Sequence, residues 1–149
     1  MEVLIDNQQA KHPIATRVVQ RKVAAILNAL DSPDAELSLV FVDDARIAQL
    51  NVAYLKHEGP TNVISFPMRE GEFGDLNPHL LGDVVISMDT CAREAQAAGL
   101  SLEERMDQLI VHGVLHLFGY DHVHNEAEAQ AMEAKSRELL TMLRHDIES

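Results

Sequence analysis

The chain has 149 residues, a formal net charge of −12, 46% hydrophobic residues and one cysteine. This length and composition predict one domain, residues 1–149, whose core needs no disulfide. The acidic balance excludes a general nucleic-acid coat protein, which would be basic. No apolar stretch is long enough to span a bilayer and the N-terminus has no signal-peptide pattern, so we expect a cytoplasmic protein.

Apolar periodicity and turn residues predict alternating strands and helices. In chain order, the first elements are a short edge strand at 3–6, a helix from Pro13 to Leu30, a buried strand at 36–42, a helix at 44–55 capped by Asp43, and strands at 63–66 and 82–87. They are followed by a helix that Asp89 caps, which reaches Ala98 and is closed by Gly99, by a helix opened by the capping box of Ser101 and Glu104, and by a tail helix from Asn125 to about His145. This order predicts an α+β fold, a small mixed β-sheet packed against about five helices.

The negative charge is distributed unevenly along the chain. Residues 1–60 carry 8 acidic and 6 basic side chains, whereas residues 61–149 carry 16 and 6. A polyanion is therefore expected to approach the N-terminal half, where Arg17, Arg21 and Lys22 form a strip at helical spacing. A solvated helix face explains that strip at least as well.

The run HGVLHLFGYDH, which begins at His112, contains three histidines at the spacing of metal ligands. His112 and His116 are four residues apart and share one helix face. Gly119 can end that helix in a left-handed conformation, so that the chain turns back and His122 supplies a third nitrogen. Three protein ligands leave the fourth position of a tetrahedral zinc to water or substrate, as in catalytic sites. A lone histidine is more often a satisfied core residue, but three at this spacing favour a metal, carried by the central helix.

Zinc peptidases share this spacing in the pattern H-E-x-x-H-x-x-G-x-x-H, but here Gly113 occupies the position of the glutamate. Because that glutamate is the general base of the peptidases, peptide hydrolysis by their mechanism is disfavoured. A zinc ion would still lower the pKa of its water to about 7. We expect the glycine to leave space beside the metal for a phosphate or a water. Asp121 is a candidate to orient a histidine or accept a proton, and a plain turn residue is the alternative.

Three segments together resemble one protein family. The histidine run at 112–122 resembles the signature of the YbeY family of bacterial metal-dependent endoribonucleases; LNVAYLKHEGPTNVISFP at 50–67 resembles its central block, and LGDVVIS at 81–87 its following strand. The resemblance implies a zinc site made by the three histidines and a nuclease specific for single-stranded RNA. It also implies maturation of the 3′ end of small-subunit (16S) ribosomal RNA, a role in late-stage ribosome quality control, and association with the ribosome or its assembly factors.

The central block departs from the family at one position. Family members usually carry an arginine directly after the tyrosine, where this chain has Leu55 followed by Lys56. Arginine is a planar bidentate donor for phosphate, a geometry that neither leucine nor lysine reproduces. We therefore expect phosphate contact to be weaker or to move to Lys56. Thr61, Asn62 and Ser65 match the block and are candidate substrate contacts, with a polar loop before a strand as the alternative.

Two other functions stay open on the residues alone. One is a ribosome assembly factor whose zinc is structural and which acts by binding. The other is a metallohydrolase with another substrate, such as a peptide or a small phosphoester. The open fourth ligand position favours catalysis, and Gly113 counts against a peptide substrate. Imidazole ligands suit zinc, although nickel and copper bind such sites as well.

Overall fold

The computed structural model of the protein describes residues 2–68, 79–120 and 125–146. Its strands are β1 (Glu2–Asn7), β2 (Glu36–Val42), β3 (Val63–Pro67) and β4 (Leu80–Ser87). Its helices are α1 (Thr16–Ala29), α2 (Asp44–Leu50), α3 (Met88–Ala98), α4 (Leu102–Leu117) and α5 (Glu126–Asp146), and a π-helical turn, η1 (Asn51–Leu55), continues α2. The order and the α+β class predicted from the sequence are confirmed.

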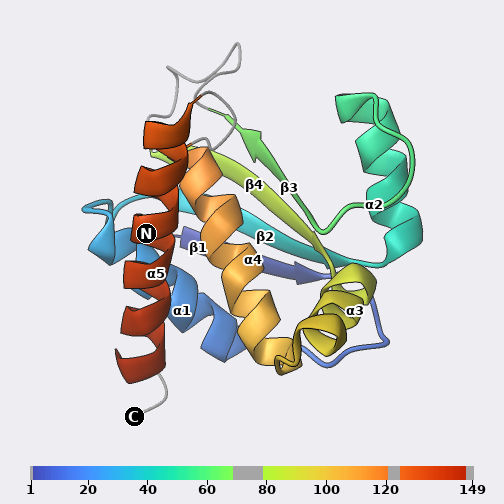
Figure 1. Cartoon of the computed structure of the whole chain (residues 1–149), viewed down its shortest axis with the longest axis horizontal. Helices are drawn as coiled ribbons and strands as arrows, with labels where there is room; N and C mark the ends of the chain where they lie inside the picture. Colours follow the sequence, from blue (N-terminus) through green and yellow to red (C-terminus); the bar gives the residue numbers. More distant parts are fainter. Residues whose placement is uncertain (1, 69–78, 121–124, 147–149) are drawn as a thin grey trace.

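The four strands form one mixed sheet in the order β1-β2-β4-β3. β1, β2 and β4 are parallel, and β3 pairs antiparallel with β4. Both β1 and β3 are therefore edge strands, as was predicted for the first. Figure 1 shows α1, α4 and α5 lying together, with α4 near the middle of the molecule, whereas α2 stands apart on the other side of β3.

The two faces of the sheet have different surroundings. Side chains alternate between the faces along each strand. Leu39 and Val84, which are paired across β2 and β4, lie in a large core with residues of α1, α4 and α5. We call this side the closed face. The next pair, Val40 and Val85, belongs to a small core with Ile47 of α2, on the side that we call the open face.

The start of α1 differs from the sequence prediction. α1 begins at Thr16 and not at Pro13. The Gln9 side chain explains the delay, because it donates to the carbonyl of His12 at 2.7 Å and accepts from the His12 N–H at 2.9 Å. These two bonds hold the chain before the proline in a turn.

The start of α3 also differs from the prediction. Ser87, not Asp89, is the N-cap, because its hydroxyl accepts from the Thr90 N–H at 3.3 Å. Asp89 lies in the first turn, where its carboxylate accepts from the N–H of Asp44 at 3.0 Å. The predicted caps are confirmed at Asp43, at Gly99 and at the capping box of α4.

The predicted basic strip on α1 is wrong in one of its three members. Lys22 is buried, and its Nζ donates to Glu103 at 2.7 Å and to Asp107 at 3.0 Å. Burial alone would lower the pKa of Lys22, but the hydrogen bonds and charges of the two acids outweigh it and raise the pKa above 10.5. Lys22 therefore ties α1 to α4 and cannot meet a polyanion, whereas Arg17 and Arg21 are exposed.

Across the described residues, no helix combines the length and the apolar character that a membrane span requires.

Candidate active site

α4 carries the first two histidines of the run and has defined ends. At its start, the Ser101 hydroxyl accepts from the Glu104 N–H at 3.0 Å, and the Glu104 carboxylate accepts from the Ser101 N–H at 2.9 Å. At its end, the N–H of Tyr120 donates to the carbonyl of Leu115 and that of Gly119 donates to the carbonyl of His116. This pair of bonds is a Schellman motif, and Gly119 has the left-handed φ of +92° that it requires. The predicted helix end at this glycine is confirmed.

His112 and His116 lie side by side on one face of α4. Their Nε2 atoms are 3.0 Å apart, and their ring centroids are 4.5 Å apart with the planes at 74°. The i, i+4 spacing therefore brings two imidazole nitrogens to one point, as the sequence predicted.

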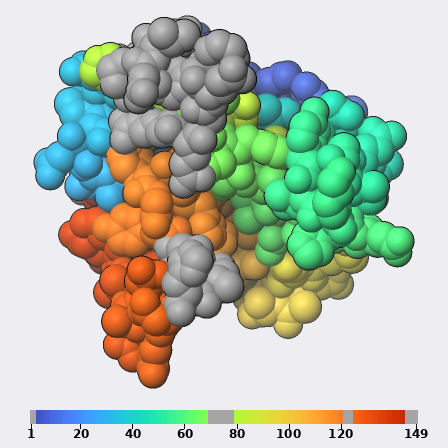
Figure 2. All heavy atoms as spheres, turned by 90° about the horizontal axis from the view of Figure 1, so that it is seen from above, coloured from blue at the N-terminus to red at the C-terminus, as the bar shows by residue number. Residues whose placement is uncertain are grey.

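These two rings line a cavity of about 330 Å³ at the edge of the sheet. α4 supplies the histidines, the chain after it supplies Gly119 and Tyr120, and β3 and η1 supply the opposite wall. Figure 2 shows β3, in green, lying between α4 and the segment formed by α2 and η1. The lining residues are Leu55, Val63, Ile64, Ser65, Pro67, His112, His116, Gly119 and Tyr120.

The expected space beside Gly113 does not exist. A Cβ atom at this position would lie 2.5 Å from Cγ1 of Val84 and 3.2 Å from Cγ2 of Val63. The glycine faces the sheet and lets α4 approach β3 and β4 closely. It therefore leaves no room for a phosphate or a water, and equally none for the glutamate that peptidases place there.

Ser65 lies in the cavity wall with its hydroxyl already engaged. Its Oγ donates to the carbonyl of Gly113 at 2.8 Å, which fastens β3 to the middle of α4. Ser65 and Val84 are paired across the two strands, so the serine is on the closed face. The structure thus gives Ser65 a structural bond close to the histidines.

Leu55 and Lys56, the two residues after Tyr54, lie in different surroundings. Leu55 lines the histidine cavity from the end of η1. Lys56 follows it with a left-handed φ of 60° and is exposed, and its Nζ lies 3.5 Å from the carbonyl of Ala53. Lys56 is not among the residues that line the cavity.

His122 and Asp121 lie outside the described residues. Within the parts of the chain that are described, no group of three potential ligands surrounds one point. The third metal ligand and the proposed acid or base therefore stay predictions.

One polar network near the site was not foreseen from the sequence. Asn62, just before β3, donates to the Glu94 carboxylate at 3.3 Å, and Arg105 donates to the same carboxylate at 3.0 Å. The network ties the start of β3 to α3 and α4. Asn62 is therefore a positioning residue for the cavity wall, and no short-range pattern connects it with Glu94, which lies 32 residues away.

Comparisons with known proteins agree on one family. A family model described as Endoribonuclease YbeY matches residues 4–144. An endoribonuclease YbeY from Geobacter sulfurreducens is 53% identical over 144 residues, which is 96% of each chain. One from Aquifex aeolicus is 45% identical over 129 residues, which is 87% of this chain and 81% of the relative.

The fold has a solved counterpart in the solution structure of TM1509 from Thermotoga maritima. The TM-score is 0.67 at 19% sequence identity, with 99% of this chain and 95% of the other covered. At this identity the likeness concerns the fold alone. The near full-length matches in sequence show that the chain belongs to the YbeY family of endoribonucleases, hydrolases whose substrate is RNA.

Proposed function

We propose that the protein is a zinc-dependent endoribonuclease specific for single-stranded RNA, with His112, His116 and His122 as the metal ligands. Its proposed substrate is the 3′ end of 16S ribosomal RNA, and its proposed role is in maturation and late-stage quality control of the ribosome in the cytoplasm. The observation that supports this best is the 3.0 Å separation of the two Nε2 atoms on α4, inside a cavity at the sheet edge.

The described histidines are suited to hold zinc. Two nitrogens on one tetrahedral zinc, each about 2.0–2.1 Å from it, lie about 3.3 Å apart. The observed separation of 3.0 Å is close to that value, and neutral imidazole is a common zinc ligand. A bound zinc supplies Lewis acidity toward a phosphoryl oxygen and a lowered pKa for water.

The residues of the chain then have distinct proposed roles. Gly113 admits no side chain beside the histidines, so the proton must be handled elsewhere, and Asp121 is the proposed group. Lys56, next to the cavity residue Leu55, is the proposed cation for phosphate. Ser65 is proposed to act chiefly by holding β3 against α4, since its hydroxyl is already bonded to the Gly113 carbonyl.

The first test is cleavage of a labelled single-stranded fragment that contains the 3′ end of 16S RNA. We expect wild-type protein loaded with zinc to cut it and identically purified His116→Ala to lose at least about 100-fold in rate, because a metal ligand is removed. Equal cleavage by both proteins would contradict the proposal. A duplex of the same sequence serves as the control for single-strand specificity.

A second test separates the enzyme from a factor that acts by binding. Cobalt-substituted protein is examined for its ligand-field spectrum, and zinc stoichiometry is measured for the wild type and the His116→Ala variant. An open site with exchangeable water supports catalysis, whereas a closed four-ligand site favours a structural metal. For Lys56→Ala, we expect a raised KM for RNA, and an unchanged KM would remove Lys56 from the proposal.

A single acidic domain needs additional contacts to find one RNA. We propose that the ribosome or a small-subunit assembly factor supplies them, with no part played by DNA or by a membrane. Co-sedimentation of the protein with small-subunit precursors, compared with mature subunits, tests this proposed association.

A further inference from the structure

The open face of the sheet has its own cavity, which the histidine site does not use. Its volume is about 430 Å³, and Tyr54, Phe66, Arg46 and Asp83 are among its lining residues. The sheet forms its floor, and α2 with η1 forms its wall. The Tyr54 side chain is large and apolar over most of its ring, and the residue is 66% exposed there.

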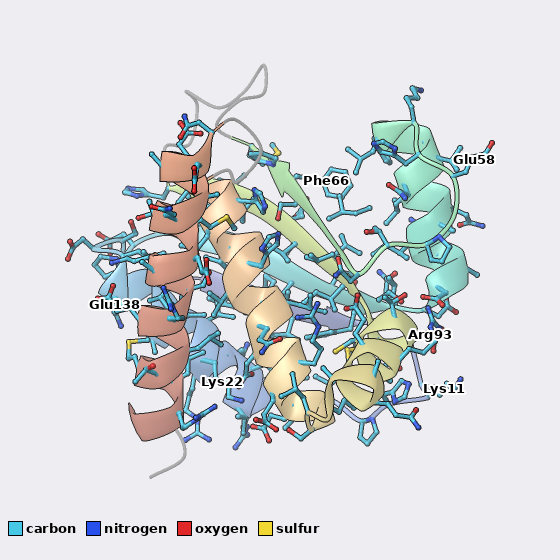
Figure 3. The ribbon with its side chains drawn as sticks, viewed as in Figure 1. Lys11, Lys22, Glu58, Phe66, Arg93 and Glu138 are labelled. Carbon is cyan, nitrogen blue, oxygen red and sulfur yellow. The ribbon has the colours of Figure 1, made fainter. Side chains whose placement is uncertain are left out.

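The two rings form a defined aromatic pair. The centroids of Tyr54 and Phe66 are 5.5 Å apart and their planes are at 80°, an edge-to-face contact. This contact orients the Tyr54 ring and leaves most of its surface in solvent. Figure 3 shows Phe66 on β3, in the space between α4 and the segment of α2 and η1. A rigid, exposed ring of this kind is a platform on which a planar group can stack.

The aromatic pair and the histidine cavity are separated only by the thickness of β3 and η1. Leu55 and Ser65 line the histidine cavity, and their chain neighbours Tyr54 and Phe66 line the cavity on the open face. Successive Cα atoms are about 3.8 Å apart, so in both η1 and β3 one residue lines the histidine cavity and its immediate neighbour lines the cavity on the open face. An RNA strand held at the histidines therefore reaches the aromatic pair by crossing the edge of β3.

We propose that the cavity on the open face is a nucleobase subsite, in which a base next to the cleaved phosphodiester stacks on Tyr54. The proposal rests on the proposed function, because it takes the histidines as the place of cleavage. Stacking on an aromatic ring needs no positive charge, so such a subsite suits an enzyme whose formal net charge is −12.

The charges of the cavity favour a base over a phosphate as the occupant. Arg46 supplies one positive charge and Asp83 one negative charge. The Asp83 carboxylate accepts a hydrogen bond from the Ser38 hydroxyl and is itself exposed, so it is oriented and still accessible. A carboxylate repels a phosphate but accepts from the amino group of a base.

The test compares kcat and KM on a short single-stranded RNA for three variants. We expect Tyr54→Ala to lower kcat/KM by about 5- to 150-fold, mainly through KM, because one base-stacking contact is removed. Tyr54→Phe keeps the ring and should stay near wild type. Val52→Ala is the matched control, since Val52 is a half-exposed apolar residue of the same turn that lines neither cavity. Equal kcat/KM for Tyr54→Ala and Val52→Ala would overturn the proposal.

Abasic substrates show whether the lost contact is to a base. One nucleotide at a time near the cleavage point is replaced by an abasic residue and each RNA is given to wild type and Tyr54→Ala. We expect one position at which the wild type loses activity and the variant loses little more, because both changes remove the same contact. Equal proportional losses at every position would mean that Tyr54 does not touch a base. The two failures are distinguishable: His116→Ala that cuts as well as the wild type contradicts the proposed function, whereas equal proportional losses on the abasic substrates contradict only the base subsite.

Discussion

The same strands present buried apolar residues to one face of the sheet and accessible polar and aromatic residues to the other. On the closed face, Val84 and Leu39 are fully buried under α1 and α4. One residue earlier in each strand, Ser38 and Asp83 lie on the open face, where both line the second cavity and Asp83 is exposed. The closed face supplies stability by excluding water, and the open face keeps polar and aromatic groups accessible. The histidine cavity lies where the two meet, at the edge strand β3.

The largest expected effect on stability comes from adding a side chain at Gly113, where α4 packs closely against the sheet. Gly113→Glu places a side chain where Val84 and Val63 already lie and buries a carboxylate, so we expect a loss of about 4 kcal/mol or more in unfolding free energy. Urea denaturation followed by circular dichroism measures it. Gly119→Ala is the control, because a Cβ at Gly119 meets no atom of the described residues within 4 Å and only its φ of +92° is strained, at about 1–2 kcal/mol. Similar losses for the two variants would contradict the close packing.

The buried ion pairs of Lys22 on α1 with Glu103 and Asp107 on α4 should give the next largest effect on stability. Lys22→Ala removes the buried ammonium group that bonds both Asp107 and Glu103, and we expect a cost of about 3 kcal/mol, at the low end for a buried pair because Glu103 is half exposed. Arg21→Ala, an exposed neighbour, should stay within about 0.5 kcal/mol.

The interaction of Lys22 with Glu103 and Asp107 also predicts that the unfolding free energy falls at alkaline pH. The pKa of Lys22 is raised on folding, so its stabilisation is complete below pH 10.5 and is lost as the pH rises through the higher folded value. Unfolding free energy measured from pH 9 to 12 should fall more steeply for the wild type than for Lys22→Met. Parallel curves would mean that Lys22 is not the group responsible.

The polar cluster around Asp44 should give a smaller effect on the unfolding free energy, and its contribution should be lost in acid and not at alkaline pH. Partial burial would raise the pKa of Asp44, but hydrogen bonds from Ser87 and Thr90, both 2.6 Å, and from Arg93 hold it below 3.8. This stabilisation is present above pH 3.8 and lost as the pH falls through the lower folded value. We expect Asp44→Asn to cost about 1–2 kcal/mol at pH 7 and the difference from wild type to shrink on acidification. A difference that stays constant from pH 7 to 2 would contradict this assignment.

Short-range patterns predicted most of the fold. Apolar periodicity located the strands and helices, and the Asp43 cap, the Ser101 capping box and Gly119 were each recognised because the residues that define them are four or fewer apart in the chain. For the same reason the pair His112 and His116 was found, since one helical turn brings them together.

What the sequence did not predict depends on contacts between distant segments. The sequence predicts space at Gly113, but Val84 of β4, 29 residues away, fills it. Helical spacing predicts Lys22 on a basic strip or a solvated helix face, but α4 brings two acids to it from 81 and 85 residues away. The cavity beside Tyr54 was not foreseen either, because it exists only where η1 and β3 are placed together.

The smallest expected effect concerns Ser65, at the border between the two faces. Ser65→Ala removes one hydrogen bond to the Gly113 carbonyl, and we expect a loss of about 1 kcal/mol in unfolding free energy. If the Ser65 hydroxyl only fastens β3 to α4, the KM for RNA should change little in Ser65→Ala. The variant should instead have a lower kcat, because β3 shifts relative to the histidines on α4. Ser65→Thr keeps the hydroxyl and should recover most of both losses. A normal kcat with a KM raised about tenfold would instead mean that Ser65 binds RNA directly, because losing a contact made equally in the ground and transition states affects KM alone.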